Sequence, residues 1–310
     1  MYRGRFAPSP TGPLHLGSLF TAAVSYLTCL QQAGEWLLRI DDIDPPREMP
    51  GAADDIIQRL DKLGFEWSGP VYFQSRRYDA YRAAVAQLRS ADLIYRCVCS
   101  RAAIAAHPDS RQGQRYPGTC RKTPAGEGVA ALRVRCPTDD IVFDDAFQGS
   151  QRTSLNAAPG DYVIWRKDGL PAYHLANVVD DTWLQITDVV RGADLIDSTA
   201  AHIHLGERLG HSPLNYGHLP VLVGNDGHKL SKQTGARGIA AGTESAAIIW
   251  TLTALGLDTQ LEADFGLVRG QAGPAPNALW KWAAQHWDPA PLCGVRALPA
   301  DTFGPMAQMD

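Results

Sequence analysis

The sequence predicts an α/β fold built around a parallel sheet, and two features carry this prediction. Short apolar runs alternate with longer segments of helical periodicity, which is typical of parallel strands joined by helical crossovers. A turn rich in Pro and Gly separates the first predicted strand from the first predicted helix. Backbone N–H groups and the positive end of a helix dipole meet at such a turn, so we expect a phosphate-binding site there.

The individual elements follow from their local patterns. A strand is expected at residues 3–8, a turn at 9–13 and a helix over 19–33 that Gly34 would cap. Further along, we expect the following elements in chain order: a strand at 36–40, a helix over 51–63 capped by Gly64, a helix over 77–91, a return to the sheet at 173–195 and 214–223, and a helical tail that begins at 244–257.

Residues from about 95 to 172 interrupt this rhythm with cysteines, short β-like runs and a Pro/Gly-rich stretch. We interpret them as an inserted subdomain. The predicted organisation is a catalytic domain over 1–240 that contains this insertion, followed by a small helical subdomain over 241–310.

Composition is that of an ordinary globular protein, with 310 residues, 45% hydrophobic and 20% charged. No apolar run reaches membrane-spanning length and no signal-peptide pattern is present, so we expect a cytoplasmic protein without membrane contact. The net charge of −4 argues against indiscriminate nucleic-acid binding. Any RNA contact would need local basic patches such as Arg76-Arg77 or residues 111–122, although either patch could equally be a solvated face.

Two short motifs suggest nucleotide chemistry. His15-Leu-Gly-Ser18 lies at the predicted helix start, where Gly17 permits close backbone approach. Lys229-Leu-Ser-Lys232 follows a predicted strand and a Gly-rich turn, and its ammonium groups could meet polyphosphate charge. Taken alone, the first could be a structural surface histidine and the second a solvated basic loop.

In this order, the two motifs resemble the His-x-Gly-His and Lys-Met-Ser-Lys-Ser motifs of class I aminoacyl-tRNA synthetases, which implies a Rossmann-like catalytic domain that binds ATP with Mg²⁺. Here Ser18 and Gln233 depart from the usual residues. The resemblance implies catalytic roles for His15 and Lys232. The ATP-binding residues that it implies are His15, Gly17, Ser18, Lys229, Ser231 and Lys232.

Three further segments resemble glutamyl-tRNA synthetases, and the likeness runs from about residue 3 to 235: Arg5-Phe-Ala-Pro-Ser-Pro-Thr-Gly12, Arg39-Ile-Asp-Asp-Ile-Asp44 and Val190-Arg-Gly-Ala-Asp-Leu195. Glutamate carries two carboxylates and an ammonium group, so its site needs cations and one anion. The glutamate-binding residues that the resemblance implies are Arg5, Ala7, Ser9, Asp41, Tyr173 and Arg191. Asp41 stands where the family has Glu, one methylene longer.

Only 75 residues follow Gly235, where the likeness ends, too few for the anticodon-binding region of a conventional glutamyl-tRNA synthetase. This truncated form resembles the glutamyl-queuosine tRNA(Asp) synthetase family. That resemblance implies activation of glutamate without tRNA, and then transfer to queuosine in tRNA(Asp) by a monomeric enzyme. The alternatives are a conventional glutamyl-tRNA synthetase, a nucleotidyltransferase that shares the first motif, and a non-catalytic paralogue that binds glutamate or ATP.

Three of the six cysteines cluster in the predicted insertion, as Cys97-Val-Cys99 and Cys120. Disulfides are not expected in a cytoplasmic protein, and this spacing suits a structural Zn²⁺ with Tyr116 or water as its fourth ligand. The same spacing resembles the zinc site of the family. The alternative is three reduced cysteines without a metal.

Overall fold

The computed structural model describes residues 1–110, 115–123, 126–224, 227–230, 238–266 and 274–300. At its centre lie the parallel strands β1 (Arg3–Phe6), β2 (Glu35–Ile40) and β3 (Tyr72–Phe73). On the other side of β1 lie β9 (Asp188–Gly192) and β10 (Asn215–Leu219), also parallel to each other. The Thr187 N–H joins the two groups by donating to the carbonyl oxygen of Arg3 at 2.9 Å. The predicted parallel sheet is therefore confirmed.

The chain leaves β1 in one direction to form β2 and β3, and later returns to form β9 and β10 on the opposite side. Such a reversal leaves a crevice at the carboxyl ends of the two middle strands, where ligands bind in open α/β sheets. Ala7 and Ser9 follow directly after β1, Asp41 follows β2, and Arg191 lies near the end of β9. Most of the predicted glutamate residues thus meet at this point.

Helices connect and cover the strands. These helices are α1 (Leu16–Gln31), α2 (Ala52–Lys62), α3 (Tyr78–Ser90), α6 (Tyr173–Trp183) and α7 (Ile196–Leu209). The helices predicted at 51–63 and 77–91 are found within a residue of those bounds, but the first part of 173–195, where we expect a return to the sheet, is helical and only Asp188–Gly192 is a strand. Short 3₁₀ turns are found at Pro45–Arg47, Gln74–Arg76, Pro108–Ser110, Ala193–Leu195 and Ala290–Leu292.

The first helix differs from its prediction at both ends. It begins at Leu16 rather than residue 19, because the side chain of His15 accepts the N–H of Ser18 and so caps the helix. At the other end, the positive φ belongs to Ala33 and not to Gly34. A Cβ on Gly34 would lie 2.5 Å from the carbonyl oxygen of Tyr2, so close packing requires this glycine. Gly64, in contrast, has the predicted left-handed conformation, with φ of 73°.

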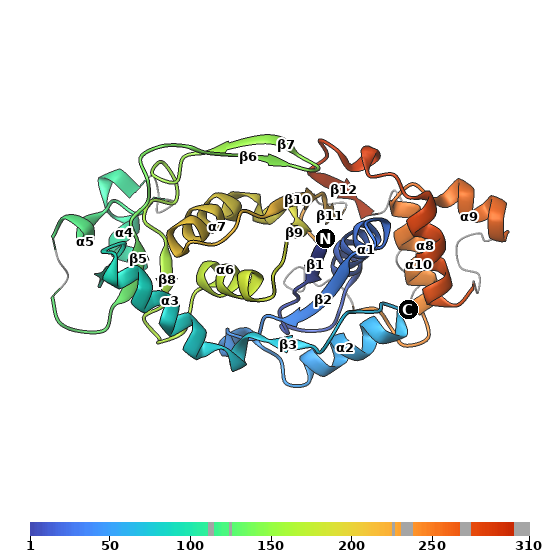
Figure 1. Ribbon diagram of the computed structural model, residues 1–310, viewed down its shortest axis with the longest axis horizontal. Coiled ribbons are helices and arrows are strands. Elements are labelled where there is room, and N and C mark those ends of the chain that lie inside the picture. Colours follow the sequence, from blue (N-terminus) through green and yellow to red (C-terminus); the bar gives the residue numbers. More distant parts are fainter. Residues whose placement is uncertain (111–114, 124–125, 225–226, 231–237, 267–273, 301–310) are drawn as a thin grey trace.

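The inserted segment contains a small antiparallel sheet of β4 (Ile94–Cys97), β5 (Ala131–Val134) and β8 (Val163–Trp165), with the short helices α4 (Arg101–Ala105) and α5 (Thr119–Lys122). Its hairpin of β6 (Ile141–Asp145) and β7 (Gly149–Thr153) runs back across the molecule to the central sheet (Figure 1). There β6 pairs in parallel with β10, through Asp145 and Tyr216. The insertion therefore contributes a strand to the catalytic part, while its division as a subdomain stays a prediction.

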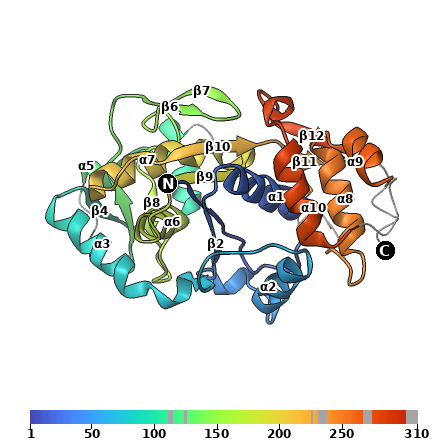
Figure 2. The same ribbon diagram turned by 45° about the vertical axis from the view of Figure 1, so that its right-hand side comes forward.

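The C-terminal part forms α8 (Glu244–Ala254), α9 (Asp258–Phe265) and α10 (Pro276–His286). Of these, α8 and α10 lie beside α1, and α9 contacts α8 (Figure 2). A short strand that the sequence analysis missed, β12 (Ala297–Pro299), pairs with β11 (Val221–Val223). The rings of Trp36, Phe65 and Trp280 stack in the core, with centroids 5.4 and 4.9 Å apart. The tail is thus packed against the first strands and helices.

Within the described part of the chain, no helix combines the length and the apolar character needed to cross a membrane.

Candidate functional site

The two sequence motifs meet in space although more than two hundred residues separate them. His15 forms an isolated antiparallel bridge with Gly238, just beyond the lysine motif. A Cβ on Gly17 would lie 3.4 Å from the carbonyl oxygen of Leu230, so the backbones of the two motifs approach closely at this glycine. The N-terminus of α1 and the start of the lysine motif therefore lie close together. Such proximity is required if both are to bind the same nucleotide.

His15 and Ser18 hold each other at the start of α1. The backbone N–H of Ser18 lies 3.2 Å from His15 Nδ1, and the Ser18 hydroxyl lies 3.2 Å from His15 Nε2. If Nδ1 accepts the amide proton, a neutral imidazole carries its own proton on Nε2. Ser18, which stands where the family motif has its second histidine, therefore contacts the imidazole ring of His15.

In the lysine motif, the structure describes Lys229 and Leu230, while Ser231 and Lys232 lie outside the described residues. Leu230 donates its N–H to the carbonyl oxygen of Leu222, which ties the motif to β11 at 2.7 Å. The Lys229 ammonium lies 2.5 Å from Asp194 Oδ2 in a half-exposed ion pair. An incoming phosphate would have to compete with Asp194 for this lysine.

Four charged side chains form a buried network at the carboxyl ends of β1 and β2. Arg5 donates from Nε and Nη2 to the two oxygens of Asp181, at 3.1 and 3.3 Å. Arg39 donates to Asp181 from Nη1 at 2.6 Å, and to Asp41 from Nε at 2.6 Å and Nη2 at 3.3 Å. Two arginines and two aspartates balance each other in charge, which burial of all four requires.

Asp41 does not face open solvent, as a simple ammonium-binding carboxylate would. Burial raises its pKa to about 6 although Arg39 acts in the opposite direction. Its backbone N–H donates to the carbonyl oxygen of Pro8, which holds it beside Ala7 and Ser9. Each carboxylate oxygen that binds Arg39 keeps capacity for a second donor.

This raised pKa predicts a pH dependence for glutamate binding. As the pH rises through about 6, Asp41 loses its proton and gains attraction for the substrate ammonium, so the KM for glutamate should fall. We expect a fall of up to about tenfold between pH 5 and 7 at saturating ATP, measured by ATP–pyrophosphate exchange. In Asp41→Asn the KM should be flat over this range. A KM in the unchanged protein that does not depend on pH would contradict this role of Asp41.

Arg191 is a buried cation of a different kind, because within the described ranges it pairs with no carboxylate. Its guanidinium instead donates to neutral acceptors, which are Tyr173 Oη (3.0 Å), Thr199 Oγ1 (2.8 Å), His218 Nε2 (3.1 Å), His202 Nδ1 (3.3 Å) and the Leu195 carbonyl oxygen (3.3 Å). Its positive charge is therefore oriented but not neutralised. A bound anion such as a carboxylate would supply the missing charge.

The histidines around Arg191 stay neutral. Burial, and next the charge of Arg191, lower the pKa of His174 to about 4 and that of His202 well below its usual value. Tyr173, with 37% of its surface exposed, starts α6 and reaches Arg191 from the open side. Arg191 thus provides the positive charge at this end of the site.

The structure also adds residues that the sequence analysis did not single out. Arg39 belongs to the Arg39–Asp44 motif, but the sequence alone assigns no role to it, to Asn177 or to Asp181. Asn177 accepts from Arg39 Nη2 at 2.8 Å. The sequence contains a signal for Asp181, since α6 carries two adjacent aspartates, Asp180 and Asp181, directly after the apolar pair Val178-Val179. A buried acid on such a helix indicates a cation partner.

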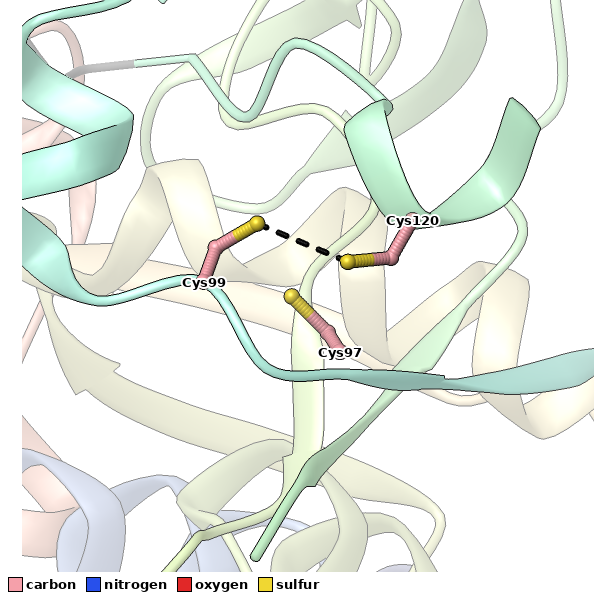
Figure 3. Close-up of side chains that lie close together, drawn as sticks. All are labelled: Cys97, Cys99 and Cys120. Atoms are coloured by element: carbon pink, nitrogen blue, oxygen red, sulfur yellow. Dashed lines mark hydrogen bonds between the residues drawn. The ribbon is translucent and has the colours of Figure 1, made fainter. Parts of the chain in front are cut away.

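The three predicted cysteine ligands come together in the insertion (Figure 3), with their sulfur atoms all within 4.8 Å of one another. Cys99 Sγ and Cys120 Sγ are 3.5 Å apart. The Tyr116 hydroxyl lies 3.4 Å from Cys97 Sγ and 3.9 Å from Cys99 Sγ. Sulfur ligands of a tetrahedral Zn²⁺ stand about 3.8 Å apart, so this donor set fits the metal.

Comparison with known proteins agrees with this geometry. Residues 1–257 match the family model of "tRNA synthetases class I (E and Q), catalytic domain". The chain is 48% identical to a glutamyl-Q tRNA(Asp) synthetase of Dechloromonas aromatica, over 96% of this chain and 99% of that protein. It is 46% identical to the one from Aromatoleum aromaticum, over 92% and 89%.

Among solved structures, a glutamate tRNA ligase from Elizabethkingia meningosepticum in complex with its amino acid superposes with a TM-score of 0.75 at 27% identity. The match covers 97% of this chain and 68% of that one. A glutamate-tRNA synthetase from Elizabethkingia anophelis superposes with a TM-score of 0.76 at 26% identity. The fold, the two motifs and these relatives agree: the chain belongs to the class I glutamyl and glutaminyl synthetases, and within them to the glutamyl-Q tRNA(Asp) synthetase family.

Proposed function

We propose that this protein activates L-glutamate with ATP in the absence of tRNA, and then transfers the glutamyl group to queuosine at the wobble position of tRNA(Asp). The observation that carries the proposal is the near full-length identity of 42–48% to proteins of that name. The geometry supports it, because Asp194, which lies three residues after the uncompensated buried Arg191, pairs with Lys229 of the second nucleotide motif.

In the proposed reaction, a glutamate carboxylate attacks the α-phosphorus of ATP and pyrophosphate leaves. Arg5 and Arg191 hold the two carboxylates, and Asp41 attracts the ammonium. Ala7 and Ser9 border the substrate at the end of β1. Tyr173 closes the open side of the site through its hydroxyl, which already binds Arg191.

The phosphate groups would lie over the start of α1. His15, Ser18 and backbone amides near Gly17 bind them, while Lys229, Ser231 and Lys232 meet the charge that develops as pyrophosphate departs. Mg²⁺, bound together with the nucleotide, would supply further positive charge to the phosphate groups. This proposal requires Lys229 to exchange its Asp194 partner for phosphate.

We also propose that Cys97, Cys99, Tyr116 and Cys120 hold one structural Zn²⁺. Burial raises the pKa of the Cys99 thiol to about 11, so Zn²⁺ would have to displace the proton of this thiol on binding. Freshly purified protein should contain about one zinc per chain, and Cys99→Ala should lose it, as elemental analysis would measure. Cys293→Ala is the matched control, since this exposed thiol lies elsewhere and should leave the zinc content unchanged. Absence of zinc from the unaltered protein would reject the site.

The domain division at about residue 240, the monomeric state and a cytoplasmic location remain part of this proposal.

The deciding experiment is ATP–pyrophosphate exchange with glutamate, glutamine or aspartate, first without tRNA and then with it. Exchange that depends on glutamate alone is the expected result. Exchange that appears only after addition of tRNA(Glu) would favour a conventional glutamyl-tRNA synthetase. No exchange under either condition would favour a binding paralogue.

A further inference from the structure

Arg191 is held in place by a chain of buried groups that starts in the inserted segment. Asp145 ends β6, and its carboxylate is completely buried against His218 of β10. His218 in turn contacts Arg191 of the neighbouring strand β9. Three strands therefore contribute one residue each to a continuous line of hydrogen bonds.

The Asp145 carboxylate has a fixed orientation. Its Oδ1 accepts three backbone N–H groups, those of Phe147 (3.1 Å), Gln148 (2.9 Å) and His218 (3.0 Å). Its Oδ2 is left to face His218 Nδ1 at 2.5 Å. Burial raises the pKa of Asp145, but the hydrogen bonds from His218 and Gln148 outweigh it and the net shift is downward. Asp145 is thus an anion, and its second oxygen, Oδ2, can only accept a hydrogen bond from His218.

His218 then has one arrangement that satisfies both neighbours. Burial lowers its pKa, with Asp145 opposing, so the ring is neutral and carries a single proton. With that proton on Nδ1, it donates to Asp145, and Nε2 accepts from Arg191 Nε at 3.1 Å. With the proton on Nε2, two N–H groups would face each other across the contact with Arg191.

We propose that Asp145 and His218 are positioning residues for glutamate binding, in which Asp145 selects the Nδ1-protonated form of His218 and this form orients Arg191 toward a substrate carboxylate. The assignment of a role to Arg191 rests on the proposed function. Thr199 completes the arrangement, because its hydroxyl lies 2.8 Å from Arg191 Nη2 and 3.0 Å from His218 Nε2. The insertion, through β6, therefore supports the glutamate pocket as well as the cysteine cluster.

Asp145→Asn tests this with little change in shape. The three backbone donors keep the amide oxygen at the Oδ1 position, so the amide NH₂ must point at His218 Nδ1. Nδ1 then becomes an acceptor, and the proton moves to Nε2, toward Arg191. The same substitution in a Ser-His-Asp triad acts by stabilising the wrong tautomer.

The first readout is ¹⁵N NMR of protein labelled at histidine nitrogen, with the His218 signals assigned by their loss in His218→Gln. We expect Nδ1–H with an unprotonated Nε2 in the unaltered protein, and the reverse in Asp145→Asn. Protonation of Nε2 in the unaltered protein would overturn the proposal, even if Asp145→Asn failed to fold. This readout needs no turnover, so a failure of glutamate activation would leave it valid.

The second readout is steady-state exchange kinetics. Asp145→Asn should raise the KM for glutamate about fivefold or more, with the KM for ATP unchanged. Asp144→Asn is the matched control, because this neighbour on β6 is exposed and should leave both constants unchanged. A glutamate KM that stays the same in Asp145→Asn, despite a reversed tautomer, would refute the link from His218 to Arg191. Equal changes in both KM values would indicate a structural role only.

Discussion

Arg39→Met should lower the free energy of unfolding by about 3–5 kcal/mol, the usual cost of removing one partner from a buried ion pair. Arg39 is 0% exposed, and its guanidinium donates hydrogen bonds to both Asp41 and Asp181. Methionine fills part of the space but leaves Asp41 without its cation and Asp181 with Arg5 alone. Urea unfolding followed by tryptophan fluorescence would measure the loss.

The matched control is Arg47→Met, which removes another arginine that pairs with an aspartate, Asp44, in a nearby segment. The Arg47 side chain is 68% exposed, so its ion pair should contribute no more than about 1 kcal/mol. Similar losses in the two variants would show that the network around Arg39 is not the stabilising feature that its burial indicates.

Arg5→Ala should raise the KM for glutamate between ten- and a hundredfold, which corresponds to about 1.4–2.8 kcal/mol for a lost charge-assisted contact. Arg5 uses Nε and Nη2 to bind Asp181, and among the described residues Nη1 has no hydrogen-bond partner that would keep it from a substrate. The KM for ATP should change little, because the proposed ATP-binding residues, among them His15 and Gly17, are unaltered in this variant. ATP–pyrophosphate exchange at varied glutamate would measure both constants.

Arg3→Ala provides the comparison for this variant, since Arg3 lies on the same strand but pairs with Glu35 at the start of β1, away from the crevice. We expect its glutamate KM to equal that of the unaltered protein. Arg5 would lose its assigned role if its replacement also left the glutamate KM unchanged.

Much of the fold could be predicted because local signals and tertiary structure agree. The helices at 52–62 and 78–90 have apolar faces of regular spacing, and their observed bounds lie within a residue of the expected ones. Gly34 shows the limit of such reasoning. Its position suggested a helix cap, but the contact that requires it comes from Tyr2, and only the tertiary structure brings Tyr2 there.

In the candidate site, too, local sequence motifs were predictive, whereas contacts between distant segments were not. Residues that a motif marks, such as Arg5 and Arg191, lie on the parallel strands β1 and β9. Their partners could not be foreseen, because they depend on pairings between distant segments. Asp145 lies in a stretch interpreted as an insertion, and only the return of β6 to β10 brings it to His218. The role of Arg39 could not be foreseen for another reason: it depends on the complete burial of the side chain, which only the tertiary structure reveals.

The packing of α10 against the first elements has a consequence for the order in which the protein can mature. Trp280 donates its Nε1–H to the Leu63 carbonyl oxygen at 2.7 Å and stacks on Phe65, so the N-terminal aromatic core is complete only after α10 has been made. At 5–20 residues per second, roughly 10–40 s of synthesis separate Phe65 from Trp280. During that interval Phe65 and Tyr26 lack the ring of Trp280 that packs on them, so the nascent chain presents an apolar surface that a chaperone could bind until α10 has been made.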